Sequence, residues 1–386
     1  MFFNKNQTMA LSLSYQPTTN AIVYSRSPIF YKFTGCDQGS YYYNISLSAT
    51  TGAVAAIAEY VTIIRTPDIN NNIIIDVSNI IKNFIRTNYS STTENVAFVK
   101  VALIEYVNAT GVVNATVVSN VCCSTYGYTN YTNGFNYVNS TTATFLMSST
   151  PHIIYLPNYG GTGNTFSLSF ANNDACTYHI NFYSTVSGAT STATVSFPAV
   201  TDGKSNIVSI PCGYQDMITT YGRTDIDPTR PMELVVNAST MAIAYSIIIK
   251  PDECTGNDLH NIKFINRYGV WDRIFIKAKV EEEISSKSET YKYNKVNTTT
   301  MTYGTDGSYH KLFTNGKKKY VMNTGWINED LNDKIGELLM SEYVYYDNIP
   351  VIITDSSIKY KTHKYDKLIN YTLNCETAFD TINNII

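Results

Sequence analysis

The stretch FINRYGVWDRIFIK, residues 264–277, has the pattern of two strands joined by a tight turn. Gly269 permits a tight or left-handed turn, and the aromatic and branched residues on either side favour pleated structure. Trp271, one of only two tryptophans in the chain, follows this turn directly. We predict that Trp271 folds back under the turn and is buried against the sheet of its own domain. A ligand-binding aromatic has the same pattern and is the alternative.

Arg267 lies inside the same turn. The planar fork of its guanidinium suits the fixing of a turn better than an ammonium group does. We therefore expect Arg267 to bind a carboxylate or a backbone carbonyl.

The composition of the whole chain favours β-structure. Its 386 residues exceed one ordinary core and predict two or three domains. The 32 tyrosines, with abundant Thr, Ile and Val, pack well on pleated surfaces. Only 15% of the residues are charged, so uncharged polar side chains must supply much of the solubility. The net charge of −3 argues against sequence-specific binding of a nucleic acid duplex, which needs clustered Lys and Arg.

Three segments follow from the strand and turn pattern, so we predict a mainly β protein with a smaller α+β part. Residues 1–150 alternate strand-like runs with turns and contain one amphipathic helix at about 77–86, predicting a β-sandwich-like domain. Residues 151–255 have short, closely spaced strands and predict a second antiparallel β domain. Residues 256–386 carry more charge and a strand-helix-strand pattern, which predicts an α+β domain.

Two helix starts are predicted from capping residues. Ser78 has the residue type that caps a helix, and apolar residues follow it at helical spacing. In the third segment, Asn328 precedes two acids at the expected start of a second helix.

Motifs that carry chemistry are weak in this sequence. YGGTGNT (residues 159–165) lacks the lysine and the helix of a phosphate loop and predicts a hairpin turn. DIDP (residues 225–228) lacks the remaining ligands of a calcium loop and predicts an Asp-Pro turn. The lysines at 317–319 are expected in a solvated turn at the start of a strand. We predict no cofactor and no metal, and we expect that the chain is not an enzyme.

Seven scattered cysteines, without a CxxC spacing, have the pattern of reduced, small apolar residues made in a cytosol. The N-terminus has no uninterrupted apolar segment, so we expect neither a signal peptide nor a membrane span.

The third segment resembles a domain of structural tail proteins from tailed phages that infect Bacteroidetes, including crAss-like phages. The similar runs occur in order, at residues 262–276, 317–346, 350–362 and 368–378. The most specific piece is the turn, made of Asn266, Arg267, Tyr268, Gly269, Trp271 and Asp272. The run IDVSNIIKNFI, residues 75–85, also looks like the short helix of such tail sandwiches. The resemblance covers about a third of the chain well, and no catalytic residues carry over from it.

The resemblance implies a protein of the virion tail, synthesised in the host bacterial cytoplasm. It implies a tail hub subunit, or a neighbouring adaptor, that binds copies of itself and other tail proteins. A receptor-binding fibre or adhesin for host surface glycans is the alternative, suggested by the Tyr- and Asn-rich stretch CCSTYGYTNYTNGFNYVNS (residues 122–140). A capsule-degrading enzyme is the third reading, and sequence alone does not locate the carboxylate pair that it needs.

Overall fold

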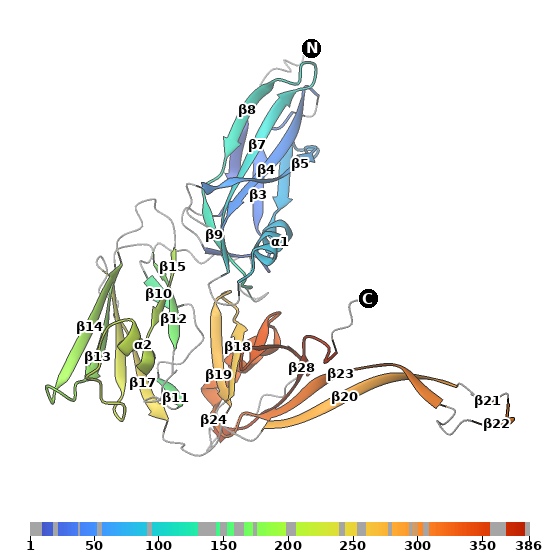
Figure 1. The fold of residues 1–386 in the computed structure, drawn as a ribbon. Helices are drawn as coiled ribbons and strands as arrows, with labels where there is room; N and C mark the ends of the chain where they lie inside the picture. Colours follow the sequence, from blue (N-terminus) through green and yellow to red (C-terminus); the bar gives the residue numbers. More distant parts are fainter. Residues whose placement is uncertain are drawn as a thin grey trace, which may run out of the picture. The chain divides into compact units, whose positions relative to one another are not determined.

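The protein is mainly β, with several sheets and short helices (Figure 1). By its internal contacts the chain divides into two compact units. Unit 1 comprises Met1–Thr255 together with Ile265–Asp272, and unit 2 comprises Gly256–Phe264 together with Arg273–Ile386. The computed structural model describes residues 10–17, 22–37, 39–51, 56–90, 95–129, 144–146, 153–157, 166–172, 176–197, 206–238, 244–252, 260–276, 280–292, 296–297, 299–303, 309–355 and 368–382.

The N-terminal part of unit 1 has two sheets. One has the order β2-β9-β7-β4-β5, with β8 also paired to β7, and the other has the order β1-β3-β6. The elements are β1 (Ser12–Tyr15), β2 (Ile22–Tyr24), β3 (Phe30–Thr34), β4 (Tyr41–Thr50), β5 (Ala58–Arg65), β6 (Asn72–Asp76), α1 (Ser78–Thr87), β7 (Val96–Val107), β8 (Val113–Val118) and β9 (Cys122–Thr125).

The core of this part is built from side chains that alternate along β4 and β7. Ile45 of β4 pairs with Leu103 of β7, Leu47 pairs with Val101, and all four side chains are buried. The residues between them point to the opposite face of the sheet, because successive side chains of a strand alternate. One face is therefore apolar core, and the other is the outer face of this sheet.

Helix α1 (Ser78–Thr87) lies where the helix at about 77–86 was predicted, but it is capped differently. Val77 occupies the N-cap, and the Ser78 side chain makes no capping bond. The carboxylate Oδ1 of Asp76 instead accepts hydrogen bonds from the backbone N–H of Ser78 at 2.9 Å and of Ile29 at 3.0 Å. The prediction that Ser78 caps the helix is wrong because Asp76, at the end of β6, reaches the free N–H first.

The remainder of unit 1 has a five-stranded sheet, β11-β17-β16-β13-β14, and a three-stranded sheet, β10-β12-β15. The pairs are antiparallel apart from β11 with β17, which is parallel. The YGGTGNT turn lies outside the described residues. The elements are β10 (Thr144–Leu146), β11 (Ile153–Pro157), β12 (Ser167–Asn172), β13 (Cys176–Tyr183), β14 (Thr190–Phe197), β15 (Asn206–Pro211), α2 (Tyr214–Thr219), β16 (Met232–Ala238) and β17 (Ala244–Asp252).

The C-terminal part has a seven-stranded sheet with the order β19-β18-β25-β26-β28-β23-β20. Ile335 and Leu338 of α3 are fully buried in the core beside it. The elements are β18 (His260–Ile265), β19 (Trp271–Ile276), β20 (Val280–Lys292), β21 (Val296–Asn297), β22 (Thr302–Tyr303), β23 (Tyr309–Asn323), β24 (Ile327–Asn328), η3 (Glu329–Leu331), α3 (Asn332–Leu339), β25 (Val344–Tyr346), β26 (Ile349–Ile353), β27 (Leu368–Ile369) and β28 (Thr372–Thr377).

Two expectations for this part need correction. The second helix begins at Asn332, because a 3-10 turn occupies the predicted start after Asn328. The lysines at 317–319 lie inside β23, because this strand already begins at Tyr309 in register with β20. Within the described residues, no helix is long and apolar enough to cross a membrane.

The capping of α1 gives a first prediction. Asp76→Ala removes two hydrogen bonds to a carboxylate and should lower the free energy of unfolding by about 1–3 kcal/mol. Ser78→Ala should cost less than half as much, because no capping bond is lost. Urea unfolding of the full chain, followed by circular dichroism, measures both. Equal losses for the two variants would contradict the capping role of Asp76.

Candidate functional site

Asn266 organises the turn between β18 and β19. Its side chain is fully buried, and its Oδ1 accepts hydrogen bonds from the backbone N–H of Tyr268 at 3.0 Å and of Val270 at 3.3 Å. Its Nδ2 donates to Oδ2 of the buried Asp272 at 3.4 Å. Asparagine suits such turns because its short side chain mimics a backbone turn. The first and last residues of the motif therefore define the shape of the turn.

Gly269 brings this turn against a second glycine far away in the sequence. Its φ of +82° is a conformation that side chains disfavour, and a Cβ there would lie 2.5 Å from the backbone N of both Tyr126 and Gly127. A Cβ on Gly127 would in turn lie 2.3 Å from the backbone O of Arg267. The two backbones approach so closely that neither position has room for a side chain.

Hydrogen bonds hold the two backbones together on both sides of the glycines. The backbone N–H of Tyr128 donates to the carbonyl of Arg267 at 2.7 Å. The Thr125 hydroxyl donates to the carbonyl of Tyr268 at 2.6 Å. These two hydrogen bonds join the turn to the last residue of β9 and to the segment that follows it.

Val270 adds an apolar contact to this junction. It is fully buried in a cluster with Ile22, Tyr24, Phe98 and Cys123 from the N-terminal part of the chain. These contacts explain why Ile265–Asp272 belongs to unit 1, although the residues on both sides of it belong to unit 2. All six residues of the turn motif lie in this inserted segment.

The prediction for Trp271 is wrong. Its side chain is half-buried, and its ring packs edge-on against Tyr89, with the ring centres 6.1 Å apart. Tyr89 lies in the N-terminal part of unit 1 and not in the sheet of the third segment. The error arose because the whole hairpin was assigned to one domain, whereas its turn packs with the other unit.

Arg267 lies over its neighbour Tyr268. The guanidinium carbon is 4.6 Å from the centre of the Tyr268 ring, and Nη2 donates to the Tyr268 hydroxyl. The Tyr268 ring is also 6.3 Å from that of Tyr24. A carboxylate or carbonyl partner for Arg267 stays a prediction.

The segment that receives the turn was missed as a functional element. Residues 122–129 were part of the stretch that suggested sugar binding, but Tyr126 is only 1% exposed. Gly127 between two tyrosines was the available signal, because a glycine in a strand end often marks a close backbone approach. Residues 130–140 of that stretch lie outside the described residues.

Two thiols lie at this junction, in Cys122 and Cys123. Burial raises the pKa of the Cys122 thiol to about 11 and that of the Cys123 thiol to about 12. Both are therefore protonated at neutral pH, and a protonated thiol is a poor nucleophile. They behave here as small apolar residues, as the sequence predicted.

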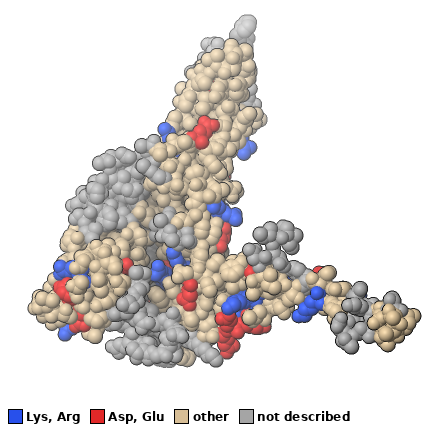
Figure 2. Space-filling model, viewed as in Figure 1, with Lys and Arg blue, Asp and Glu red and all other residues tan. Residues whose placement is uncertain are grey.

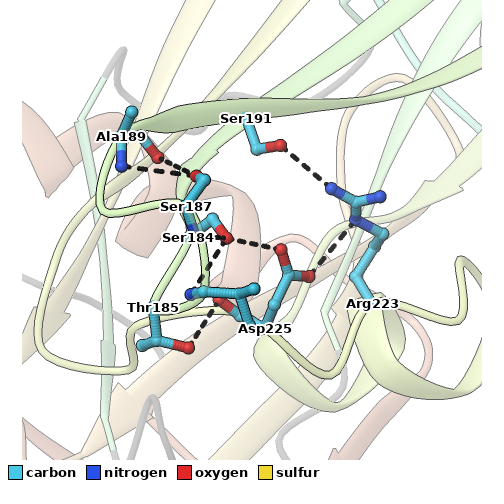
Figure 3. A network of polar contacts seen from close by, with 8 residues as sticks. Ser184, Thr185, Ser187, Ala189, Ser191, Arg223 and Asp225 are labelled. Carbon is cyan, nitrogen blue, oxygen red and sulfur yellow. Dashed lines mark hydrogen bonds and ion pairs between the residues drawn. The ribbon is translucent and has the colours of Figure 1, made fainter.

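A second polar cluster surrounds Asp225 (Figure 3). The Ser184 hydroxyl donates to its Oδ2 at 2.6 Å, and Nε of Arg223 lies 3.5 Å from its Oδ1. The hydrogen bond from Ser184, with a smaller effect of Arg223, lowers the pKa of the Asp225 carboxyl. Arg223 also donates to the Ser191 hydroxyl at 3.0 Å. This carboxylate thus links the β13–β14 turn to the loop after α2.

The second acid of the DIDP segment makes a turn. Oδ1 of Asp227 accepts hydrogen bonds from the backbone N–H of Thr229 at 2.9 Å and from its hydroxyl at 2.7 Å. This is the Asp-Pro turn that the sequence predicted. Across the described part of the chain, no three His, Cys, Asp or Glu side chains gather as a metal site would require.

Comparisons with known proteins assign no family. No known protein family matches this chain, and no curated protein does. Two Escherichia coli alpha-2-macroglobulin structures align with it: the native conformation at 9% identity over 81% of this chain, with a TM-score of 0.23, and the trypsin-activated form at 9% identity over 95%, also with a TM-score of 0.23. The chain spans 21% of the length of each.

A biofilm-associated protein, the BSP domain, aligns at 10% identity over 82% of this chain and 65% of its own, with a TM-score of 0.18. Scores this low carry no argument about fold or function.

The two facing glycines give a second prediction. Gly127→Ala should lower the free energy of unfolding by about 3 kcal/mol, because its Cβ collides with the carbonyl of Arg267. Gly269→Ala should cost more, because it adds a strained φ to a collision. Urea unfolding of the full chain measures both losses.

Gly222→Ala is the matched control. Gly222 also has a positive φ, +64°, but nothing lies within 4 Å of the added Cβ, so only the strain of about 1 kcal/mol remains. A loss at Gly127 no larger than that at Gly222 would show that the two backbones are not in close contact.

Proposed function

We propose that this chain is a structural virion protein of a tailed bacteriophage, a tail hub subunit that assembles as a homo-oligomeric ring and connects tail components. The proposal rests on the ordered resemblance of the third segment to tail proteins. It needs no catalytic residues, because the role is mechanical. The partners are copies of this chain and other tail proteins, and the location is the tail.

The packing of the turn motif is consistent with a structural role. The residues of the turn motif, which are the most specific part of the resemblance, contribute to internal packing and hydrogen bonding. Asn266 and Asp272 are buried, and Gly269 lies against Gly127. Residues that build a joint in this way suit a protein whose task is to hold a shape.

The finer architecture is part of the same proposal. The first two segments, 1–150 and 151–255, are taken as two β-sandwich-like domains, and 256–386 as an α+β tail domain. In this division the turn at 266–272 is a piece of the third segment that completes the first.

A receptor-binding fibre is the weaker candidate. Its motivation was an exposed, Tyr-rich stretch at residues 122–140, and the described end of that stretch is covered by the turn. Tyr126 is buried there and cannot stack on a sugar ring.

Immunogold electron microscopy tests the proposal. An antibody raised against the purified chain is applied to phage particles whose genome encodes this sequence. We expect gold at the tail, near its junction with the head. Gold on the capsid alone, or particles that lack the chain by mass spectrometry, would refute a tail role. Binding of the purified chain to host polysaccharides on a glycan array would favour the fibre instead.

A further inference from the structure

Strand β14 forms one edge of the five-stranded sheet of unit 1 (Figure 1). It pairs with β13 over its whole length, Thr190–Phe197, in one uninterrupted register. On its other side, none of the described strands pairs with it. Every second residue of such an edge strand leaves its backbone N–H and C=O without a strand partner. The edge of β14 is therefore a surface that accepts a further strand.

Natural sheets protect their edges, but β14 carries none of the usual devices. Charged side chains, proline and bulges are the features that prevent another strand from pairing with an edge. The sequence of β14, TSTATVSF, contains no charged residue and no proline. Its pairing with β13 contains no bulge. The strand is thus open to pairing by its composition as well as by its position.

The other long edge strands of the described part do carry such devices. Strand β20, at the edge of the seven-stranded sheet, bears Glu281, Glu283 and Lys287, and its pairing with β23 has a bulge. Figure 2 shows acidic and basic side chains along these two strands. Strand β5 bears Glu59 and Arg65, and a bulge interrupts its pairing with β4. Among the described edge strands of eight or more residues, β14 alone lacks protection.

The exposed side chains of β14 bond back to β13 and leave the edge uncovered. The Thr192 hydroxyl donates to Oδ1 of Asn181 at 2.9 Å, and the Thr194 hydroxyl lies 3.0 Å from Nδ1 of His179. Ala193, between the two threonines, points to the opposite face and is buried. These side chains are short, so none of them folds over the backbone at the edge.

The hairpin end of β14 is held in place by the polar cluster around Asp225 (Figure 3). Nη2 of Arg223 donates to the Ser191 hydroxyl at 3.0 Å, and Oδ2 of Asp225 accepts from the Ser184 hydroxyl. The backbone N–H of Thr185 donates to the carbonyl of Asp225 at 2.7 Å. The edge is thus preorganised, which lowers the entropy cost of pairing with a further strand.

A second copy of this chain fits this edge better than a foreign strand does. Edges that select a foreign strand do so through pockets beside them, which receive alternate side chains of that strand. The Thr, Ser and Ala side chains of residues 190–194 are too small to build such pockets. A second β14 needs none, because it has the same length and brings no charge to the contact.

Two β14 edges match in direction and in face. A two-fold axis normal to the sheet runs the two strands antiparallel, which is the more stable way to pair. The same axis keeps like faces on the same side, so the buried Ala193 of each copy stays on the core face. In the register centred on Ala193, Thr192 of one copy lies opposite Thr194 of the other. Such Thr–Thr pairs stabilise antiparallel strands.

We propose that the free edge of β14 pairs with the same edge of a second copy of this chain, so that the two five-stranded sheets join into one. The contact uses the same surface on both copies and closes after two of them. It goes beyond the ring of the proposed function and does not depend on it. Assemblies with dihedral symmetry combine two-fold contacts of this kind with ring contacts.

Opposite charges on the two edges test the pairing. Thr192→Lys with Thr194→Lys places lysines opposite one another, and like charges directly opposite destabilise a strand pair. Sedimentation of the full chain should show self-association at least tenfold weaker for this double variant. Thr192→Glu with Thr194→Glu should weaken it similarly. An equimolar mixture of the two double variants should associate as strongly as the unchanged chain, because each lysine then faces a glutamate.

A matched control keeps the same charge on the same face, one strand away from the edge. Thr177→Lys with His179→Lys places two lysines on β13, and it removes the same contact between His179 and Thr194. This variant should associate like the unchanged chain, because its lysines do not meet those of the second copy. Equal weakening by the two lysine pairs, or no recovery in the mixture, would overturn the pairing.

Hydrogen exchange of the unchanged chain gives a second measurement, which needs no variant to fold. The amides of residues 190–197 should exchange at least tenfold more slowly where the chain is dimeric than where it is monomeric. The added strand supplies the hydrogen-bond partners that the edge lacks. Exchange there that does not change with protein concentration, or a chain that stays monomeric throughout, would contradict the proposal. Neither result bears on the tail role, which immunogold labelling tests separately.

Discussion

The close approach of Gly127 and Gly269 is the constraint on which the attachment of the turn to the N-terminal part of unit 1 depends. With no side chain at either position, the two backbones come near enough for Thr125 and Tyr128 to bond the carbonyls of the turn. Val270 then enters an apolar cluster of the N-terminal part, and Trp271 reaches Tyr89. A methyl group at either glycine would push the turn away from all of these contacts at once. The motif is thus a joint between distant parts of the sequence, and its residue types follow from that task.

The sequence predicted the local parts of this joint well and its location badly. The turn itself was predictable, because Gly269 and the flanking β-formers act over a few residues. The strand-like runs of residues 1–150 were predictable in the same way, because side-chain alternation acts between neighbouring residues of a strand. The partner of the turn was not predictable, because Gly127 lies 142 residues before Gly269 and no local pattern links the two. Assigning the whole hairpin to one domain then misplaced Trp271.

Other errors have the same origin in contacts that are distant or compete locally. Ser78 has the residue type of a cap, but Asp76 reaches the free N–H of the helix from the preceding strand. The lysines at 317–319 resemble a turn, yet pairing with the long β20 carries them into a strand. Of the sites that suggested chemistry, the DIDP segment forms the predicted turn, and Asp225 joins a network of polar contacts with Ser184 and Arg223.

Low charge links the structure to the proposed role. The outer face of the N-terminal sheet carries no charged residue in the rows of Tyr42, Asn44 and Ser46, and Ile64 on this face is 70% exposed. A soluble monomer usually breaks such surfaces with charges. Surfaces of this kind suit a protein that is covered by neighbours in an assembly.

The central claim, that the turn at 266–272 folds as part of unit 1, can be tested directly by tryptophan fluorescence. Trp326 is exposed, so Trp326→Phe leaves Trp271 as the sole tryptophan at little cost in stability. In that background, Ile45→Ala weakens the core of unit 1 and Leu338→Ala that of unit 2, and each should cost about 2–5 kcal/mol locally. We expect the urea midpoint of Trp271 fluorescence to fall with Ile45→Ala and to stay unchanged with Leu338→Ala. A midpoint that follows Leu338→Ala alone would contradict the account.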